Sequence, residues 1–169
     1  MEVEQAVRTR RTHKVYGPEP VDRATLQALF DLARWAPNHH LTNPWRFRVV
    51  GPAALGRLKS AAGPQDAPKL DRAPALVAVS VVRSDDAVQA QEDLCAAAVA
   101  AYLVLLGAHD RGLAGYWRTP AVLRTVAGRA ALSVTEDEHL IGLLHLGWAR
   151  QEQRVPERVP ADDVVTWLD

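Results

Sequence analysis

The chain has 169 residues, 48% of them hydrophobic, which is enough for one domain with a sizeable core and short for two. Its 20 basic residues balance 20 acidic ones, so the composition argues against a general electrostatic attraction to nucleic acid or to an anionic membrane. The one cysteine, Cys95, cannot form an internal disulfide, and the acidic, polar N-terminus does not read as a signal peptide. We therefore expect one domain over residues 1–169 in a reducing compartment, the cytoplasm.

The first part of the chain predicts two helices and a strand. Apolar residues at helical spacing predict a short amphipathic helix that delivers Arg10 and Arg11 at its end. A second helix is expected over residues 22–35, followed by a polar and aromatic loop between two prolines and a strand over residues 45–50. Because a residue before proline avoids the helical region, Asn43 is expected to be extended.

The middle of the chain predicts the core. Residues 51–52, Gly-Pro, start a helix, and the valine-rich run 75–82 predicts a strand that is buried on both faces. A long helix is expected over residues 86–109, nearly apolar on all sides in its second half, so that its own domain or a second subunit must cover it. Its apolar run 94–108 is shorter than the roughly 17 to 25 residues of a membrane helix. We interpret it as a buried helix in which Cys95 is structural.

The last part of the chain predicts two strands and a tail. A strand is expected over residues 113–117, and the pair Thr119-Pro120 is expected to supply a hydroxyl cap and the first position of a short helix over residues 121–129. Residues 139–149 predict the last core strand. The charged and proline-rich tail ends in the apolar segment 164–168, which we expect to pack on the sheet edge of a partner subunit.

Several side chains could carry chemistry, although the residues alone leave the function open. Arg10 and Arg11 can offer forked, charge-assisted hydrogen bonds to a phosphate, and Thr12 adds a hydroxyl. Two arginines at a helix end are by themselves more often a solvated pair that compensates the helix dipole. The adjacent His39 and His40 could suggest a metal, but no carboxylate or cysteine follows at ligand spacing, so we expect none. There is no HExxH motif, paired CxxC motif or phosphate-binding P-loop.

Three segments resemble the nitroreductase family of FMN-dependent oxidoreductases. They are Arg10-Arg11-Thr12, the loop 36–47 with its Pro-Trp-Arg-Phe end, and Gly115-Tyr116-Trp117-Arg118-Thr119. Their order and spacing are most similar to the small YdjA-type members of that family. The resemblance implies an α+β fold with a mixed or antiparallel sheet covered by helices, in an intertwined homodimer with FMN in each of two interface clefts.

The same resemblance implies which residues contact FMN. Arg10, Arg11 and Thr12 would hold its phosphate and ribityl chain, and Arg154 or Arg150 in the tail would add a phosphate contact. The other expected contacts are Trp35, His39, Asn43, Trp117, Arg118 and Thr119. Among these, Arg118 is the cation expected near the flavin ring, where it would stabilise reduced, anionic flavin.

The resemblance also implies the reaction. NADH or NADPH would reduce FMN, and a nitroaromatic, quinone or similar small-molecule acceptor would reoxidise it in a ping-pong sequence. The flavin carries the chemistry, so no catalytic side chain is required. A non-catalytic flavin-binding dimer, or a purely structural dimer, is the alternative. We expect no metal, nucleic-acid or membrane partner.

Overall fold

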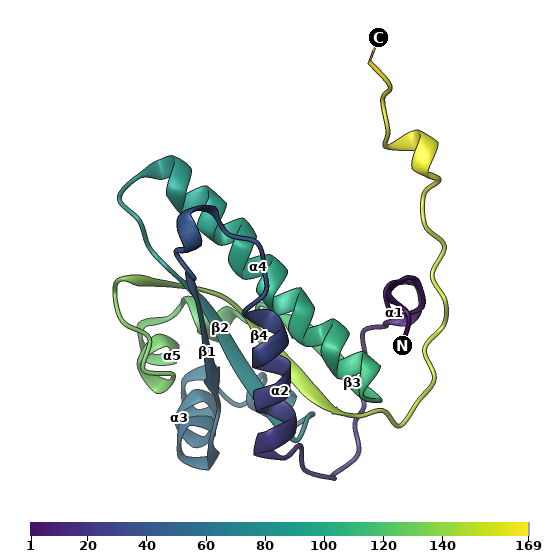
Figure 1. Ribbon diagram of the computed structural model, residues 1–169. Coiled ribbons are helices and arrows are strands. Elements are labelled where there is room, and N and C mark those ends of the chain that lie inside the picture. Colours follow the sequence, from purple (N-terminus) through teal and green to yellow (C-terminus); the bar gives the residue numbers. More distant parts are fainter. Residues whose placement is uncertain (169) are drawn as a thin grey trace.

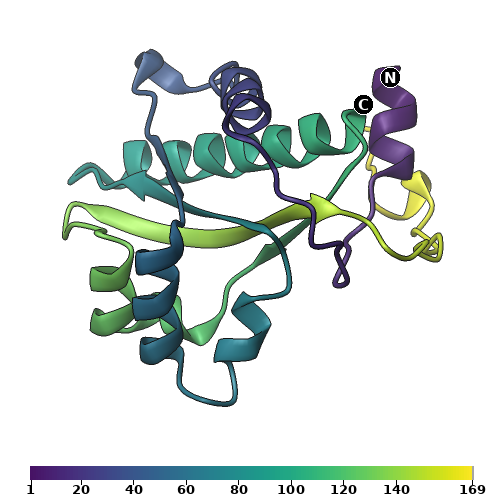
Figure 2. The same ribbon diagram turned by 90° about the horizontal axis from the view of Figure 1, so that it is seen from below.

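The structure is a computed structural model that describes residues 1–168. A four-stranded antiparallel sheet, in the order β1-β2-β4-β3, lies between two layers of helices (Figures 1 and 2). The strands are β1 (Trp45–Val49), β2 (Ala75–Val82), β3 (Leu113–Arg118) and β4 (Glu138–Trp148). The α-helices are α1 (Val3–Thr9), α2 (Arg23–Ala33), α3 (Pro52–Ala62), α4 (Ala87–Asp110) and α5 (Val126–Ala131). The short 3-10 helices are η1 (His39–Leu41), η2 (Ala67–Leu70), η3 (Ala121–Arg124) and η4 (Ala161–Asp163). The expected α+β architecture is confirmed.

The inner strands β2 and β4 form the centre of the core. Val77 and Val79 of β2 pack with α2 and α4 on one face, and Leu76 and Ala78 pack with α3 and η3 on the other. Figure 2 shows the two helical layers on opposite sides of the sheet. Every residue of β2 except the last is buried. The prediction of a doubly buried strand over residues 75–82 is therefore confirmed, and the helical layer on each face of the sheet explains why both faces of β2 are apolar.

The long helix α4 covers only one side of the sheet and is itself covered on one side. It begins after Asp86, whose carboxylate accepts a hydrogen bond from the backbone N–H of Gln89 at 2.8 Å. The helix is long and apolar enough to span a membrane, but half of its most apolar stretch is buried in the fold, so it packs as a core helix. The expectation that Cys95 is buried is wrong for the single chain, because Cys95 lies with Val88 and Val99 on the side of α4 that faces away from the sheet.

The loop before β1 departs from the expected geometry. Asn43 has a φ of +46°, in the left-handed region, and not the extended conformation expected before a proline. Two local hydrogen bonds explain this. Its backbone N–H donates to Oδ1 of Asn38 at 2.9 Å, and its side-chain Nδ2 donates to the carbonyl of Leu41 at 2.6 Å. Asparagine tolerates left-handed backbone when its amide can bond locally in this way.

The segment after β3 also differs from the prediction. Thr119 does not cap a helix over residues 121–129; the chain instead makes the 3-10 turn η3 and starts again as α5. The hydroxyl of Thr125 caps α5 by accepting the N–H of Gly128 at 2.9 Å. A Cβ atom at Gly128 would lie 1.9 Å from the carbonyl oxygen of Val122, so only glycine permits this tight restart.

A buried histidine lies in the sheet. His145 in β4 is 1% exposed, and its ring lies 6.0 Å from that of Tyr116 on the neighbouring strand. Within residues 1–168, neither ring nitrogen has a hydrogen-bond partner. Burial, with a smaller contribution from the cations Arg118 and Arg72, lowers the pKa of His145 to about 4. The fold therefore holds this imidazole in its neutral form.

We expect His145 to make the fold acid-sensitive. A histidine whose folded pKa lies below its unfolded value contributes stability that is present above the unfolded pKa, near 6.5, and is lost as the pH falls toward about 4. A depression of about 2.5 pKa units corresponds to about 3 kcal/mol in the free energy of unfolding. Denaturant unfolding at several pH values between 7 and 4 should show a clearly smaller loss in His145→Leu than in the natural chain, where His13 and His109, whose pKa values are also lowered, add only part of the loss. The control is His139→Leu, an exposed histidine of the same strand, which should keep the natural slope.

Candidate functional site

The segment after α1 is attached to the edge of the sheet. Thr12 forms a parallel β-bridge with Gly115 of β3, and the N–H of His13 donates to the carbonyl of Gly115 at 3.2 Å. A second bridge joins Tyr16 to Ala149, just after β4. These bridges hold Arg10 and Arg11 beside the edge strand β3, near the C-terminal end of α4, where Figure 1 shows α1.

A small pocket forms where this segment meets the tail. It has a volume of about 220 Å³, and the residues that line it are Arg10, Arg11, Thr12, Gln153, Arg154, Pro156 and Arg158. We call it the N-terminal arginine pocket. The structure thus brings together the residues expected to hold a phosphate, and of the two tail candidates it is Arg154, and not Arg150, that lines the pocket. Arg150 is bonded instead to Glu19.

Two donors in this pocket lack an acceptor. The Arg11 guanidinium bonds through Nη1 to the carbonyls of Arg8 at 2.7 Å and Arg10 at 2.9 Å, and the Arg10 guanidinium lies 5.7 Å from the centre of the Tyr102 ring. The Nε atoms of Arg10 and Arg11 are nevertheless buried without a hydrogen-bond partner within residues 1–168. An unpaired buried donor costs about 1 to 3 kcal/mol. The oxygens of a phosphate would remove this cost, so the pocket fits the phosphate of FMN.

The charges around the N-terminal arginine pocket are also positive. None of the four arginines of the pocket forms an ion pair with a carboxylate in the part of the chain that the structure describes. Burial lowers the pKa of His109, and the charges of Arg10 and Arg11 lower it further. The pKa of His13 is lowered by burial and then by His109 and Arg10. The region therefore carries an excess of positive charge that an anion would balance.

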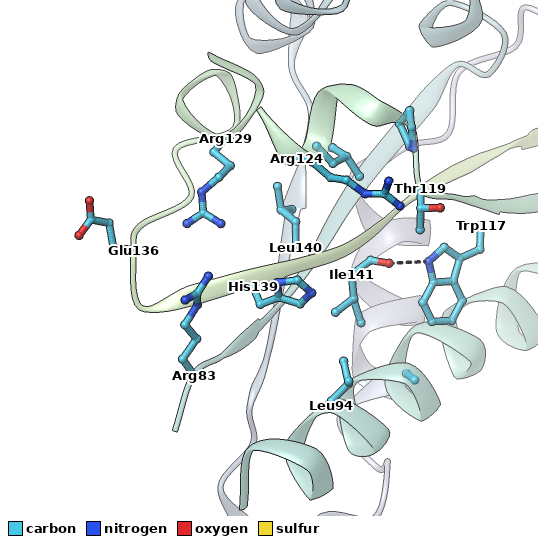
Figure 3. Close-up of a pocket in the computed structure, with 13 residues that line it drawn as sticks. Arg83, Leu94, Trp117, Thr119, Arg124, Arg129, Glu136, His139, Leu140 and Ile141 are labelled. Carbon is cyan, nitrogen blue, oxygen red and sulfur yellow. Dashed lines mark hydrogen bonds between the residues drawn. The ribbon is translucent and has the colours of Figure 1, made fainter. Parts of the chain in front are cut away.

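A bulge in β4 positions Trp117. Val79 and Ser80 of β2 pair with Gly142 and Leu140, so Ile141 is the extra residue of a β-bulge. The indole Nε1 of Trp117 donates to the free carbonyl of Ile141 at 3.1 Å, as Figure 3 shows. A Cβ atom at Gly142 would lie 1.9 Å from this Nε1, so a glycine is required below the ring. The bulge thus fixes the orientation of an aromatic side chain at the surface.

Arg118 points to the other face of the sheet. Its guanidinium lies 5.7 Å from the centre of the Tyr116 ring and donates a long hydrogen bond of 3.5 Å to the carbonyl of Lys69. Neighbouring residues of a strand point to opposite faces, so Trp117 and Arg118 cannot contact the same side of one ligand without a change in the backbone. The role expected for Arg118 beside the flavin ring remains a prediction, and alternation alone could have shown the conflict.

The remaining expected contacts lie at the other end of α4. Trp35 is 81% exposed, and His39 bonds through Nδ1 to Glu92 at 2.8 Å, while the hydroxyl of Thr42 donates to Asp93 at 2.6 Å. These bonds hold the loop that carries Asn43 against the first turns of α4. An open depression of about 790 Å³ lies there, lined by Pro37, Asn38, His39, Ala87, Val88, Gln91, Glu92, Cys95, Ala96 and Val99.

The two groups of expected contacts are far apart in one chain. The loop contacts α4 at Glu92, and the N-terminal arginine pocket lies near His109, 17 residues further along the same helix. At a rise of 1.5 Å per residue this separation is about 26 Å. One FMN molecule cannot touch both groups within one chain.

Sequence reasoning missed a cleft of about 890 Å³ beside the start of β4 (Figure 3). We call it the β4 cleft. Its lining includes Trp117 and Thr119, which were expected, and three arginines that were not: Arg83, Arg124 and Arg129. These arginines come from three separate segments, so no local motif could have revealed them. Within residues 1–168, no three histidine, cysteine, aspartate or glutamate side chains are grouped as a metal site.

Comparisons with known proteins give matches in both sequence and fold. Residues 7–148 match the model of the nitroreductase family. The chain is 27% identical over 177 residues to YfhC of Bacillus subtilis (strain 168), named as an NAD(P)H nitroreductase, covering 95% of this chain and 91% of YfhC. Its fold matches a nitroreductase-like family protein from Bacillus cereus with a TM-score of 0.90 at 19% identity, over 99% of this chain and 96% of the other. It also matches the FMN and NADPH-dependent nitroreductase NfnB from Sphigopyxis sp. strain HMH with a TM-score of 0.84 at 19% identity, over 100% of both chains.

The contact of the Trp117 indole with Gly142 and Ile141 gives a testable prediction. Gly142→Ala should displace the indole and break its bond to Ile141, with a loss of about 1 to 3 kcal/mol in the free energy of unfolding. In a Trp117→Ala background the same change should cost much less, because the clashing ring is absent. Gly56→Ala is the matched control, since nothing lies within 4 Å of a Cβ atom there and alanine favours the helix. Equal losses from Gly142→Ala in both backgrounds would mean that Trp117 is not the clashing group.

Proposed function

Because the chain belongs to the nitroreductase family, we propose that it is an FMN-dependent oxidoreductase that uses NADH or NADPH to reduce small acceptors such as nitroaromatics or quinones. The observation that carries the proposal is the pair of buried, unpartnered Nε atoms of Arg10 and Arg11, in a pocket that Arg154 closes. The free thiol of Cys95 suits the reducing cytoplasm, where we place the enzyme in this proposal.

In this proposal the protein binds and orients the cofactor. When bound, FMN supplies the transfer of electrons from the nicotinamide to the acceptor in ping-pong order. Arg10 and Arg11 hold the phosphate with charge-assisted hydrogen bonds, and the hydroxyl of Thr12 adds a neutral one. Gly115, bridged to Thr12, lies two residues before Trp117 in β3, or about 7 Å along the strand. A ligand anchored at the pocket can therefore extend along β3 to Trp117 and Thr119.

We further propose that the working unit is a homodimer. The 26 Å between the two groups of expected contacts disappears if the loop of one copy lies beside the N-terminal arginine pocket of another. The exposed side of α4 with Val88 and Val99 supplies an apolar surface for such a contact. The tail supplies a second one: Figure 1 shows it extending away from the domain, and Trp167 and Leu168 are 88% and 89% exposed. An apolar tail of this kind is stable in water only when it packs on something.

The first test of this function separates phosphate binding from ring binding. Arg10→Ala or Arg11→Ala should weaken FMN binding by about 10- to 150-fold, the equivalent of one charge-assisted hydrogen bond. Riboflavin, which lacks the phosphate, should lose little affinity. Titration of both flavins by fluorescence measures the two effects. The natural protein loaded with FMN should be yellow and should lose its colour when NADPH or NADH is added without oxygen.

The control for this test is Arg8→Ala, because Arg8 is exposed and paired with Glu4 outside the pocket. It should bind both flavins normally. Equal losses for FMN and riboflavin in the pocket variants would refute the phosphate assignment. A protein that binds FMN but is not bleached by either nucleotide would be the non-catalytic flavoprotein, and one that never takes up FMN would be the structural dimer.

The composite site can be tested by mixing two damaged chains. The pocket variant carries Arg10→Ala with Arg11→Ala, and the loop variant carries His39→Ala with Asn43→Ala. If each site takes its pocket from one chain and its loop from the other, a mixed dimer contains one intact site and one doubly damaged site. FMN binding should therefore be low for each variant alone and should return to about one site per mixed dimer.

Light scattering should show a dimer in all three preparations. Each variant refolded alone is the control for reassociation. Failure of the mixture to regain FMN binding, with mixed dimers present, would place the whole site within one chain.

A further inference from the structure

We propose that the β4 cleft is a binding site for small organic anions, in which a carboxylate or phosphate lies among Arg83, Arg124 and Arg129. The planar part of such a ligand would lie at the Trp117 end of the cleft. Only the placement of the planar part rests on the proposed function, because Trp117 and Thr119 line the cleft and also lie on the expected path of the flavin. The proposal predicts that the protein prefers substrates that carry a negative charge.

The three arginines converge on the cleft from separate elements. Arg83 follows β2, Arg124 ends η3 and Arg129 lies in α5. In Figure 3 the guanidinium groups of Arg83 and Arg129 point toward each other at the start of β4, and that of Arg124 reaches toward Thr119. Like charges brought together in this way repel, and the repulsion is relieved when an anion lies between them.

The protein supplies these cations with few acceptors of its own. Arg83 donates through Nε to the carbonyl of Glu138 at 3.3 Å, and Arg129 donates to that carbonyl at 3.2 Å and to the carbonyl of Thr135 at 2.5 Å. These bonds to neutral carbonyls hold the two guanidinium groups in place but do not cancel their charge. Among residues 1–168, Arg124 makes no side-chain hydrogen bond, and a guanidinium has five donor N–H groups.

The nearby carboxylates are engaged or directed elsewhere. The carboxylate of Glu138 points to the opposite side, where Arg48 binds it through two bonds of 2.7 and 2.5 Å and Ser80 donates to it. These bonds lower the pKa of Glu138 to about 2, so this charge stays committed to Arg48. Glu136 is the one carboxylate in the lining, and Figure 3 shows it on the outer side of its loop. In the described part of the chain, none of the three arginines forms an ion pair.

The other end of the cleft is apolar. Leu94 and Ala98 of α4 line this end together with Trp117 of β3 and Ile141 of β4. A volume of about 890 Å³ is within the range of small-molecule sites, which are mostly apolar with a few placed polar groups. The combination of an aromatic wall and three cations suits a planar molecule that carries an acid group. Both an acidic electron acceptor and the phosphorylated adenosine half of NADPH have this chemistry.

Binding measurements test the proposal and separate these two sources. The probes are 4-nitrobenzoate, its neutral analogue 4-nitrobenzyl alcohol, and adenosine 2′,5′-bisphosphate, each titrated by calorimetry into the FMN-loaded protein. Arg124→Ala and Arg83→Ala should each weaken binding of an anionic probe by roughly tenfold or more, as expected for one charge-assisted hydrogen bond. Binding of the neutral analogue should be unchanged. A loss confined to 4-nitrobenzoate assigns the cleft to the acceptor, and a loss confined to the bisphosphate assigns it to NADPH.

The control is Arg23→Ala, an exposed arginine at the start of α2, which should bind all three probes normally. The proposal is overturned if the cleft variants bind both anions as tightly as the natural chain, if neither anion binds the natural chain, or if Arg23→Ala loses affinity equally. The same titrations on protein without FMN keep this test independent of the proposed function. A chain that takes up no flavin can still show the anion site, and a working flavoenzyme can still lack it.

Discussion

The burial of β2 and β4 on both faces determines most of this architecture. Two strands without an exposed face need a helical layer on each side, and the chain supplies α2 with α4 on one side and α3 with α5 on the other. The edge strands β1 and β3 then carry the functional segments, since each has only one neighbour in the sheet. The loop before β1 reaches one end of α4, and the N-terminal segment bonded to β3 reaches the other end.

The molecule holds two groups of arginines that form no ion pair with a carboxylate among the described residues. One group closes around the N-terminal arginine pocket, and the other lines the β4 cleft. The fold does not lack acidic groups, because the chain has as many acidic as basic residues. One of its two buried carboxylates among the described residues, that of Glu138, joins β1, β2 and β4 through Arg48 and Ser80. The excess positive charge is therefore confined to these two sites. The fold gives no reason for uncompensated arginines there, whereas the proposed binding of anions does.

The sequence predicted those parts of the structure that depend on neighbouring residues. The apolar run of β2, the start of α4 near residue 86 and the arginines that follow α1 could each be recognised locally. The bulge at Ile141 could not, because it arises from the register between two strands that are distant in sequence. The left-handed Asn43 shows a local rule losing to a stronger local effect, since its own hydrogen bonds outweigh the preference of a pre-proline residue. Arg83 of the β4 cleft is separated from Arg124 and Arg129 by α4 and β3, so only the tertiary fold brings the three together.

The position of α4 between the two halves of the proposed site has a consequence for variation in length. Each residue added to or removed from a helix turns everything beyond it by about 100° and shifts it by about 1.5 Å. An insertion between Glu92 and His109 would therefore turn the loop of one chain away from the orientation that suits the pocket of the next. Insertions in surface loops such as that between α3 and β2 would leave both ends of α4 unchanged. Among natural relatives, the number of residues in this part of α4 should be nearly invariant, while the loops differ freely.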